Sequence, residues 1–257
     1  MSWKRMQLFE VADWETFPAV LRFYMVAFLD RLHEMVGSAE VLGDRLSRVL
    51  EQHDLNHVQD FCSGNGGLAR DVFQSIRQKQ TGLTWTMSDK FPQSLESIQG
   101  MDYLEQSIDV TNTEQWPKCE QTLHTIFCAF HHFTPAEARQ ILEHSQQEKL
   151  HLCVFEMSNN AQPKYIWWLA ILSAFVTCLI LTPTIKGVTL KQLLFTYLIP
   201  ILPICIAWDG AVSNARTYTK SDLEQLIDWL DEGYIWTIEE IVGKAPMPML
   251  CLWGSPQ

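Results

Sequence analysis

A carboxylate and three glycines stand close together in residues 60–67, Asp-Phe-Cys-Ser-Gly-Asn-Gly-Gly. Glycines at a strand-to-helix turn let the backbone approach a ligand closely and lead into a helix N-terminus. A second carboxylate, Asp89, comes 23 residues after Gly66, at the end of the next predicted strand. An acid there can bind ribose hydroxyls. The pattern indicates a nucleotide-type cofactor site; the alternatives are an ordinary turn and an Asp89 that merely caps the turn after it.

The elements that must position this turn are short apolar strands alternating with helices. Amphipathic helices are predicted first, over residues 15–36 and 39–53. Strands follow in the run that begins at 57 and in 83–90, 103–112, 122–133 and 150–158, with helices over 68–79 and 134–147. Thr134 is the predicted N-cap and Pro135 the first residue of the latter helix. A helix over 218–233 and strands over 234–242 and 247–254 complete the series.

This alternation predicts an α/β fold with a Rossmann-like, mostly parallel sheet and a terminal antiparallel strand pair. Residues 1–54 are expected to form N-terminal cap helices, and residues 55–158 together with 213–257 the α/β core. Residues 159–212 are expected to form a hydrophobic helical insertion after the fifth strand.

Two uncharged runs, residues 165–185 and 192–208, dominate this insertion. The first has the length of a membrane helix, and aromatic residues lie near the ends of both runs. Lys186 and Lys191 between the runs, and Pro200 and Pro203 within the second, argue against a spanning hairpin. A pair of helices in the membrane interface and an apolar lid packed on the domain or on a second subunit are both left open.

Residues 60–67 resemble motif I of the class I S-adenosylmethionine-dependent methyltransferases, in which an acidic residue precedes a G-x-G-x-G run. Asp60, Gly64 and Gly66 match, while Cys62 stands in place of the first glycine. The resemblance covers residues 55–157 well. It implies that Asp60 contacts the methionine amino end of S-adenosylmethionine, and that Cys62, Gly64 and Gly66 line this cofactor.

The same resemblance implies further cofactor contacts. Asp89 matches the ribose-binding acid, and Lys90 follows it. Asp109 and Val110 resemble the pair of residues that brackets the adenine. Ala129, near the end of the fourth strand, completes the expected cofactor-binding set.

Two histidines, His131 and His132, also end the fourth strand, as one or two histidines do in similar small-molecule methyltransferases. His132 is the candidate catalytic base that takes the proton of the nucleophile. Methyl transfer often needs only alignment, however, so shaping the pocket is its alternative role. His131 and Glu156, which ends the fifth strand, are candidate substrate contacts. Because no cysteine or histidine set has metal-ligand spacing, no metal site is predicted.

Asp209 is a second candidate catalytic residue. It ends the second uncharged run, where a charge is costly without a partner. It either pairs with Arg216 or faces the pocket, where it would select an amine or cationic nucleophile. Arg216, and Tyr24 of the first helix, are candidate substrate-binding residues.

The composition indicates which partners to expect. The chain has 257 residues and a net charge of −11, with Lys and Arg scattered singly, which argues against nucleic acid. Seven cysteines without a C-x-x-C pair, and a first segment without the apolar core of a secretion signal, indicate the cytoplasm. The expected partner is a small-molecule substrate. Contact of residues 163–208 with the cytoplasmic face of a membrane, and a homo-oligomer, are left open.

The functional prediction is methyl transfer from S-adenosylmethionine to a small-molecule nucleophile by direct displacement. One alternative is a non-catalytic, membrane-anchored binding protein on a methyltransferase-like fold. Another is a nicotinamide-dependent oxidoreductase, because Gly64, Gly66 and Ala69 also fit G-x-G-x-x-A.

Overall fold

The chain divides into two compact units. The computed structural model describes residues 4–92, 98–117, 119–230, 233–244 and 248–257. One unit comprises Met1–Val36 and Asn159–Thr219 and is called the helical unit below. The other comprises Gly37–Ser158 and Lys220–Gln257 and is called the sheet unit.

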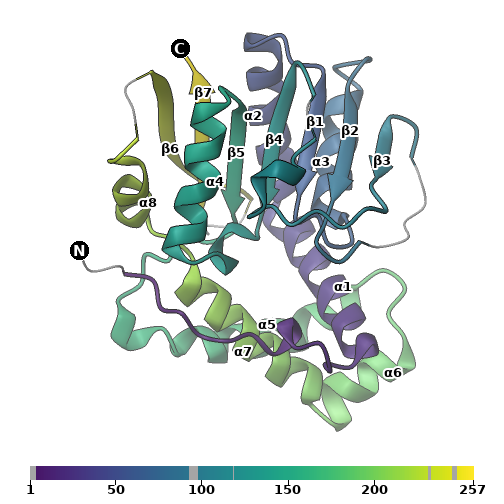
Figure 1. The fold of residues 1–257 in the computed structure, drawn as a ribbon. Coiled ribbons are helices and arrows are strands. Elements are labelled where there is room, and N and C mark those ends of the chain that lie inside the picture. Colours follow the sequence, from purple (N-terminus) through teal and green to yellow (C-terminus); the bar gives the residue numbers. More distant parts are fainter. Residues whose placement is uncertain (1–3, 93–97, 118, 231–232, 245–247) are drawn as a thin grey trace. The chain divides into compact units, whose positions relative to one another are not determined.

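A seven-stranded sheet forms the centre of the sheet unit, in the order β3-β2-β1-β4-β5-β7-β6 (Figure 1). The first five strands pair in parallel, and β7 pairs antiparallel with both β5 and β6. The predicted mostly parallel sheet with a terminal antiparallel pair is therefore confirmed. The strands are β1 (His57–Phe61), β2 (Thr84–Ser88), β3 (Met101–Tyr103), β4 (Thr122–Phe127), β5 (His151–Glu156), β6 (Tyr234–Val242) and β7 (Pro248–Pro256).

The register brings the carboxyl ends of the central strands to one edge. Phe61 of β1 lies opposite Ser88 of β2 and opposite Ile126 of β4. All six residues of β4 are buried, as expected of a parallel strand covered on both faces. The residues that follow β1, β2 and β4 therefore leave the sheet at the same level, where open α/β sheets bind ligands.

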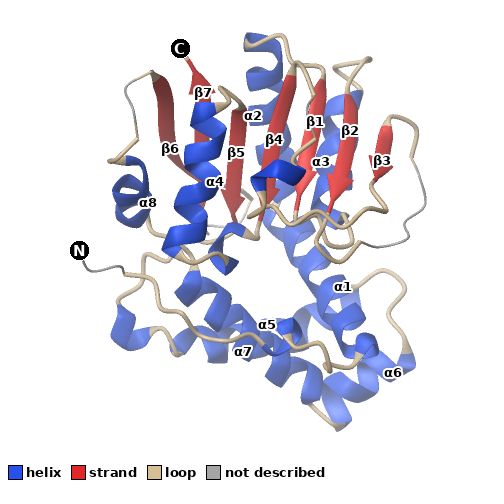
Figure 2. Cartoon of the chain, viewed as in Figure 1, coloured by secondary structure: helices blue, strands red, loops and turns tan. Residues whose placement is uncertain are grey.

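Helices cover both faces of this sheet: α2 and α3 lie on one face, and α4 and α8 on the other (Figure 2). Thr134 caps α4 with a capping box shared with Glu137, and Pro135 is the first helical residue, as predicted. The capping box fixes the start of α4 directly after the histidine pair. The helices are α2 (Ser38–Gln52), α3 (Gly67–Arg77), α4 (Pro135–Gln147) and α8 (Lys220–Ile227), with short 3-10 turns η2 (Thr113–Gln115) and η3 (Phe130–His132).

The helical unit confirms the hydrophobic helical insertion after the fifth strand. Its α5 and α7 pack along each other, and α1 packs against both. Tyr24 and Phe28 of α1 share a buried apolar cluster with Cys178 of α5 and Leu202 and Ile206 of α7. Its helices are α1 (Ala19–Val36), α5 (Leu169–Leu181), α6 (Leu190–Leu193) and α7 (Ile201–Arg216), with short helices η1 (Val11–Asp13), η4 (Lys164–Ile166), η5 (Thr182–Thr184) and η6 (Leu194–Leu198).

Among the described residues, no single helix combines the length and apolar character needed to cross a bilayer. Leu190–Leu198 and Ile201–Arg216 meet the criterion only as a pair, and they are bent by 77° where they join. Pro200 lies at this bend, whereas Pro203 is accommodated in the first turn of α7.

The third strand differs from its prediction. It covers Met101–Tyr103 and ends where the predicted strand, 103–112, begins. Met101 pairs with Trp85 and is buried, whereas Glu105, Gln106 and Ser107 are exposed and offer no apolar face to a sheet. Asp109 and Val110 consequently lie in the turn after the strand.

The two units also divide at residues other than the predicted boundaries. Residues 37–54 belong to the sheet unit because α2 packs on α3. Residues 213–219 belong to the helical unit because α7 continues without a break to Arg216. Of the predicted terminal elements, residues 231–232 of the helix over 218–233 and residue 247 of the last strand lie outside the described residues.

Candidate cofactor site in the sheet unit

The glycine segment forms a tight turn between β1 and α3. The N–H of Gly66 donates to the carbonyl of Ser63 at 2.7 Å, and Gly66 then caps α3. Cys62, Gly64 and Gly66 have φ values of 57°, 53° and 70°, in the left-handed region that glycine adopts at little cost. A Cβ placed on Gly64 would meet no atom within 4 Å. The turn therefore has an open side at Gly64 from which a ligand can reach the backbone.

Asp60 lies beneath this turn and is 1% exposed. One carboxylate oxygen accepts a hydrogen bond from the Ser63 hydroxyl and the other from the Thr125 hydroxyl, each at 2.6 Å. Burial raises the pKa of Asp60 to about 7, because the loss of hydration outweighs these two hydrogen bonds. A nearby positive charge would favour the ionised form of this carboxyl group.

The carboxylate of Asp89 is directed at the glycine turn. Its Oδ2 accepts from the Gly64 N–H at 2.9 Å, and its Oδ1 accepts from the Phe91 N–H at 2.8 Å. A carboxylate has about four lone-pair positions, so both oxygens keep acceptor capacity. The predicted neighbourhood of Asp89 and the turn is present in the structure.

Cys62 does not supply a thiolate at this site. Burial raises the pKa of its thiol well above the ordinary value, and the negative charges of Asp89 and Asp60 add to the shift. A protonated thiol is a poor nucleophile and a poor metal ligand. Cys62 therefore acts at this position as a small, uncharged side chain.

Lys90, Asp109 and Val110 form the next part of the site. Lys90 Nζ lies 2.8 Å from Asp109 Oδ2, and the N–H and hydroxyl of Thr111 donate to Asp109 Oδ1 at 3.0 and 2.7 Å. Burial alone would raise the pKa of Asp109, but the hydrogen bonds from Lys90 and Thr111 outweigh it and hold that pKa below its ordinary value. Asp109 is thus an anion that fixes its own turn.

The backbone of Val110 is held on one side only. Its carbonyl accepts from the indole of the buried Trp116 at 2.9 Å. Within the part of the chain that the structure describes, the N–H of Val110 has no protein acceptor. Val110 is 3% exposed, so this N–H is a buried donor, and its contact with the cofactor stays a prediction.

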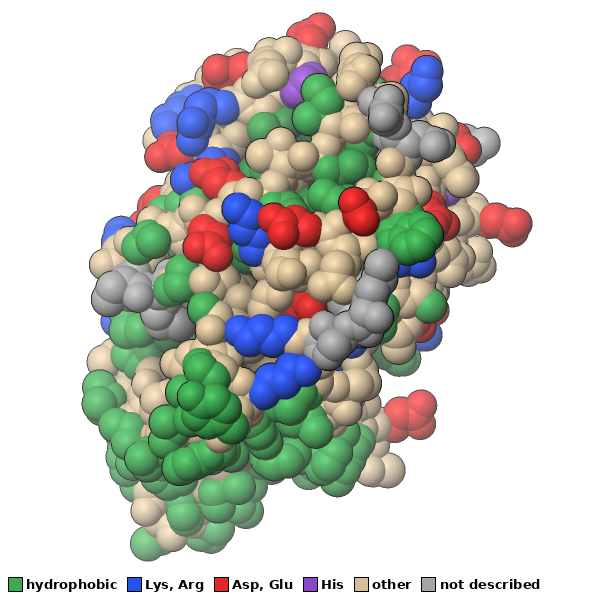
Figure 3. Space-filling model, turned by 90° about the vertical axis from the view of Figure 1, so that its left-hand side faces the viewer, with side chains coloured by type: hydrophobic (Ala, Val, Ile, Leu, Met, Phe, Trp, Pro, Cys, Tyr) green, Lys and Arg blue, Asp and Glu red, His purple; other side chains and the backbone are tan. Residues whose placement is uncertain are grey.

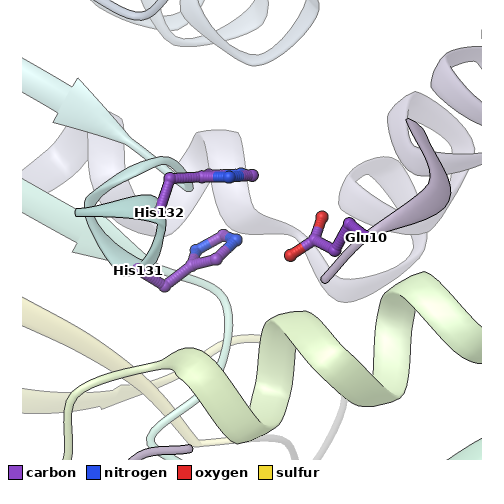
Figure 4. Close-up of side chains that lie close together, drawn as sticks. All are labelled: Glu10, His131 and His132. Atoms are coloured by element: carbon purple, nitrogen blue, oxygen red, sulfur yellow. The ribbon is translucent and has the colours of Figure 1, made fainter. Parts of the chain in front are cut away.

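Two histidines that follow β4 lie close to a glutamate at the end of β5. Cys128 has φ 51°, Ala129 follows it, and the chain enters η3. Glu156, at the end of β5, accepts from the His131 N–H through Oε1 and lies 2.9 Å from His131 Nδ1 through Oε2. The rings of His131 and His132 lie side by side with centroids 4.4 Å apart (Figure 4). Glu156 thus holds His131, and His131 supports the half-buried His132.

Comparison with solved structures agrees with this architecture. One similar structure is the plantazolicin methyltransferase BpumL in complex with a monoazolic desmethylPZN analog and SAH. The alignment covers 93% of this chain and 88% of BpumL, with 14% sequence identity and a TM-score of 0.51. The fold is that of the class I S-adenosylmethionine-dependent methyltransferases.

Two other solved structures resemble the chain less closely. The plantazolicin methyltransferase BamL, in complex with a triazolic desmethylPZN analog and SAH, has 10% identity and a TM-score of 0.49, with 92% of this chain and 98% of that chain covered. Human N-acetylserotonin methyltransferase in complex with SAM has 12% identity and a TM-score of 0.46, with 88% and 57% covered. No protein-family model matches the sequence, and no curated protein matches it.

Three candidate catalytic or substrate-binding residues lie in the helical unit. The Tyr24 hydroxyl accepts from Thr189 at 3.0 Å. Asp209 is 6% exposed, and its two oxygens accept from the N–H groups of Val11 and Ala12 at 2.7 and 3.0 Å. Asp209 therefore lies within α7 and holds η1, and its role in catalysis stays a prediction.

Arg216 was expected either to pair with Asp209 or to bind substrate. Its guanidinium lies 3.2 Å from Glu10 and 3.2 Å from Asp13, and it is 4% exposed. These ion pairs tie the N-terminal segment to the end of α7. A contact of Arg216 with substrate stays a prediction.

Sequence reasoning missed three residues around the turn. Thr125 lies opposite Asp60 in the β1–β4 register, Ser63 binds the other oxygen of Asp60, and the Tyr103 hydroxyl donates to the Gly64 carbonyl at 3.0 Å. Ser63 could have been found, because it lies inside the motif. Thr125 and Tyr103 could not, because strand register and the end of β3 are set by tertiary pairing.

Proposed function

We propose that the protein transfers a methyl group from S-adenosylmethionine to a small-molecule nucleophile by direct displacement. The observation that carries this proposal is the carboxylate of Asp89, which points into a glycine turn whose Gly64 is open to a ligand. The fold supports the same conclusion. The plantazolicin methyltransferase BpumL, which has the same fold, was crystallised with SAH, which supports the choice of cofactor.

The residues of the sheet unit fit this cofactor. The remaining acceptor positions of Asp89 suit two vicinal ribose hydroxyls. The N–H of Val110 suits an adenine ring nitrogen. The open side of Gly64 admits the chain that joins ribose to methionine, and Asp60 lies close enough to the turn for its charge to act on a cationic group.

Bound S-adenosylmethionine supplies a methyl group on a positively charged sulfonium. The contribution of the protein is then alignment of the nucleophile with that methyl group, which can supply much of the rate enhancement. The anionic forms of Asp60 and Asp89 favour binding of the cationic cofactor over its neutral product.

His132 is the candidate group for accepting the proton of the nucleophile. Glu156 fixes His131 through two contacts, and the ring of His131 supports that of His132. His132 is the candidate base because it follows β4 at the edge where open α/β sheets bind ligands, and His131 and Glu156 are positioning residues.

A small-molecule substrate is supported by the net charge of −11, since binding to nucleic acid relies on neutralising phosphates. BpumL, which has the same fold, was solved with a monoazolic desmethylPZN analog.

Calorimetric titration of the purified protein tests the proposal. S-adenosylmethionine and S-adenosylhomocysteine are expected to bind, and NADH is expected not to bind. Gly64→Ala places a methyl group on the open side of the turn and should weaken cofactor binding by about tenfold or more. Gly187→Ala is the matched control, because Gly187 also has a positive φ of 74° and a Cβ there also meets no atom within 4 Å, but it lies outside the turn. Binding of NADH alone, or equal binding by the two variants, would refute the proposal.

A further inference from the structure

The helical unit exposes an extensive apolar surface. It is defined by Leu172, Val176 and Ile180 of α5 and by Leu190, Leu198 and Ile204 of α6, η6 and α7. Their exposed fractions are 63%, 44%, 65%, 86%, 75% and 58%. Figure 3 shows hydrophobic side chains gathered over this part of the chain. Monomeric proteins in water rarely expose large apolar patches, and such patches are typical of surfaces that bind a protein partner or a membrane.

These helices are two-sided. Cys178 and Leu181 of α5, and Leu202 and Ile206 of α7, are buried in the cluster that they share with α1. The opposite side of each helix carries the apolar surface. A helix with a core of its own on one side and apolar residues on the other lies along a boundary between protein and an apolar medium.

The usual distribution of polar and apolar side chains is inverted in α6 and η6. Gln192 and Thr196 are 2% and 0% exposed, whereas Leu190 and Leu198 are 86% and 75% exposed. A helix facing water shows the opposite arrangement, with its polar side chains outward. The inversion indicates that the medium outside this surface is less polar than water.

Polar groups near the surface satisfy their hydrogen bonds within the helical unit. The Ser173 hydroxyl donates to the Ala170 carbonyl at 3.1 Å, and the Tyr197 hydroxyl donates to the Leu179 carbonyl at 2.5 Å. The indole of Trp168 donates to the Tyr165 carbonyl at 3.1 Å. Each of these three donors bonds to a backbone carbonyl of the helical unit instead of relying on water. Internal satisfaction is what a lipid environment requires.

The charge distribution identifies the kind of lipid. Residues 157–208 contain no Asp or Glu, and their only charged residues are Lys164, Lys186 and Lys191, in a chain whose net charge is −11. Lys186 pairs with Glu34 of α1 at 2.7 Å. Lysines beside an apolar helical face, with exposed tryptophan and tyrosine, match the interface of an anionic membrane. A symmetric second copy would instead bring the lysines of both chains together.

We propose that this apolar surface docks the protein on the headgroup boundary of an anionic bilayer. The helices lie along the membrane, their buried sides against the unit's own core and their exposed leucines and isoleucines among the acyl chains. The proposal does not depend on methyl transfer. An Asp89→Ala variant is expected to bind membranes like the wild type.

Co-sedimentation of the full chain with vesicles tests this. Vesicles of phosphatidylcholine are compared with vesicles that also contain phosphatidylglycerol, and the wild type is expected to prefer the latter and to dissociate at high salt. Leu172→Glu and Leu198→Glu should each weaken binding by about tenfold or more, and Lys191→Gln by about fivefold. Val242→Glu is the matched control, because Val242 is 61% exposed but lies on β6 of the sheet unit.

Circular dichroism and the midpoint of thermal unfolding show whether each variant is folded. Absence of vesicle binding by the wild type, or equal binding by Leu172→Glu and Val242→Glu, overturns the proposal. Sedimentation velocity without lipid tests whether a second copy of the chain covers this surface instead of a membrane. A wild-type dimer that Leu172→Glu dissociates, with no vesicle binding, would make this surface a subunit interface instead.

Discussion

Replacement of Asp89 is the sharpest test of the cofactor site. In the structure each oxygen of Asp89 already accepts one backbone hydrogen bond, from Gly64 and from Phe91. The remaining lone pairs are the acceptors proposed for the ribose hydroxyls. Asp89→Ala removes all of these acceptors, whereas Asp89→Asn keeps one carbonyl oxygen in the same place.

The magnitude follows from the number of hydrogen bonds. A hydrogen bond to a charged group contributes about 1.5–3 kcal/mol. Loss of two should therefore weaken binding by about 3–6 kcal/mol, or about a hundredfold to ten-thousandfold in Kd. Asp89→Asn loses one of the two and should weaken binding by about tenfold to a hundredfold.

Calorimetric titration with S-adenosylhomocysteine measures these changes. Asp102→Ala is the control, since Asp102 is an exposed carboxylate on the neighbouring strand β3. The thermal unfolding midpoint of each variant is measured in parallel. A folded Asp89→Ala variant whose Kd lies within threefold of the wild-type value, a difference of about 0.7 kcal/mol, would show that Asp89 does not hold the ribose. The cofactor site would then be wrongly assigned.

Two further predictions concern pH. Burial raises the pKa of Asp60 to about 7, and a cationic cofactor favours the ionised form of this carboxyl group. The affinity for S-adenosylmethionine should therefore fall by up to about tenfold per pH unit as the pH drops below 7. Calorimetric titration should find no such slope in Asp60→Asn. Burial lowers the pKa of His124 from 6.5 to about 4, so the unfolded chain binds a proton that the folded chain does not, and stability present above pH 6.5 is lost as pH falls toward 4. Urea unfolding measures how much the free energy of unfolding falls between pH 7 and pH 5. This fall should be smaller in His124→Phe than in the wild type, by up to about 2 kcal/mol. An equal fall in the variant and the wild type would contradict the prediction.

Local sequence patterns predicted most of the elements and the candidate cofactor residues. The glycines of the β1–α3 turn, the capping box at Thr134 and the apolar runs of β1, β4 and β5 act over a few residues. Asp60 and Asp89 were predicted as cofactor-binding residues on the same local basis, because Asp60 lies near the end of β1 and Asp89 directly follows β2. The third strand was misplaced, since Met101–Tyr103 is short and is held by pairing with β2 and not by a pattern of its own.

Which side chains come into contact depends on tertiary packing, which the sequence patterns did not predict. The pairing of Asp60 with Thr125 follows from the β1–β4 register, and the contact of Asp89 with Gly64 follows from the parallel alignment of β1 with β2. The same holds in the helical unit, where the uncharged sequence of α6 and η6 does not reveal that Gln192 faces inward and Leu198 outward. Hydrophobic periodicity is a local property, whereas register and the inner side of a helix depend on packing between segments far apart in the chain.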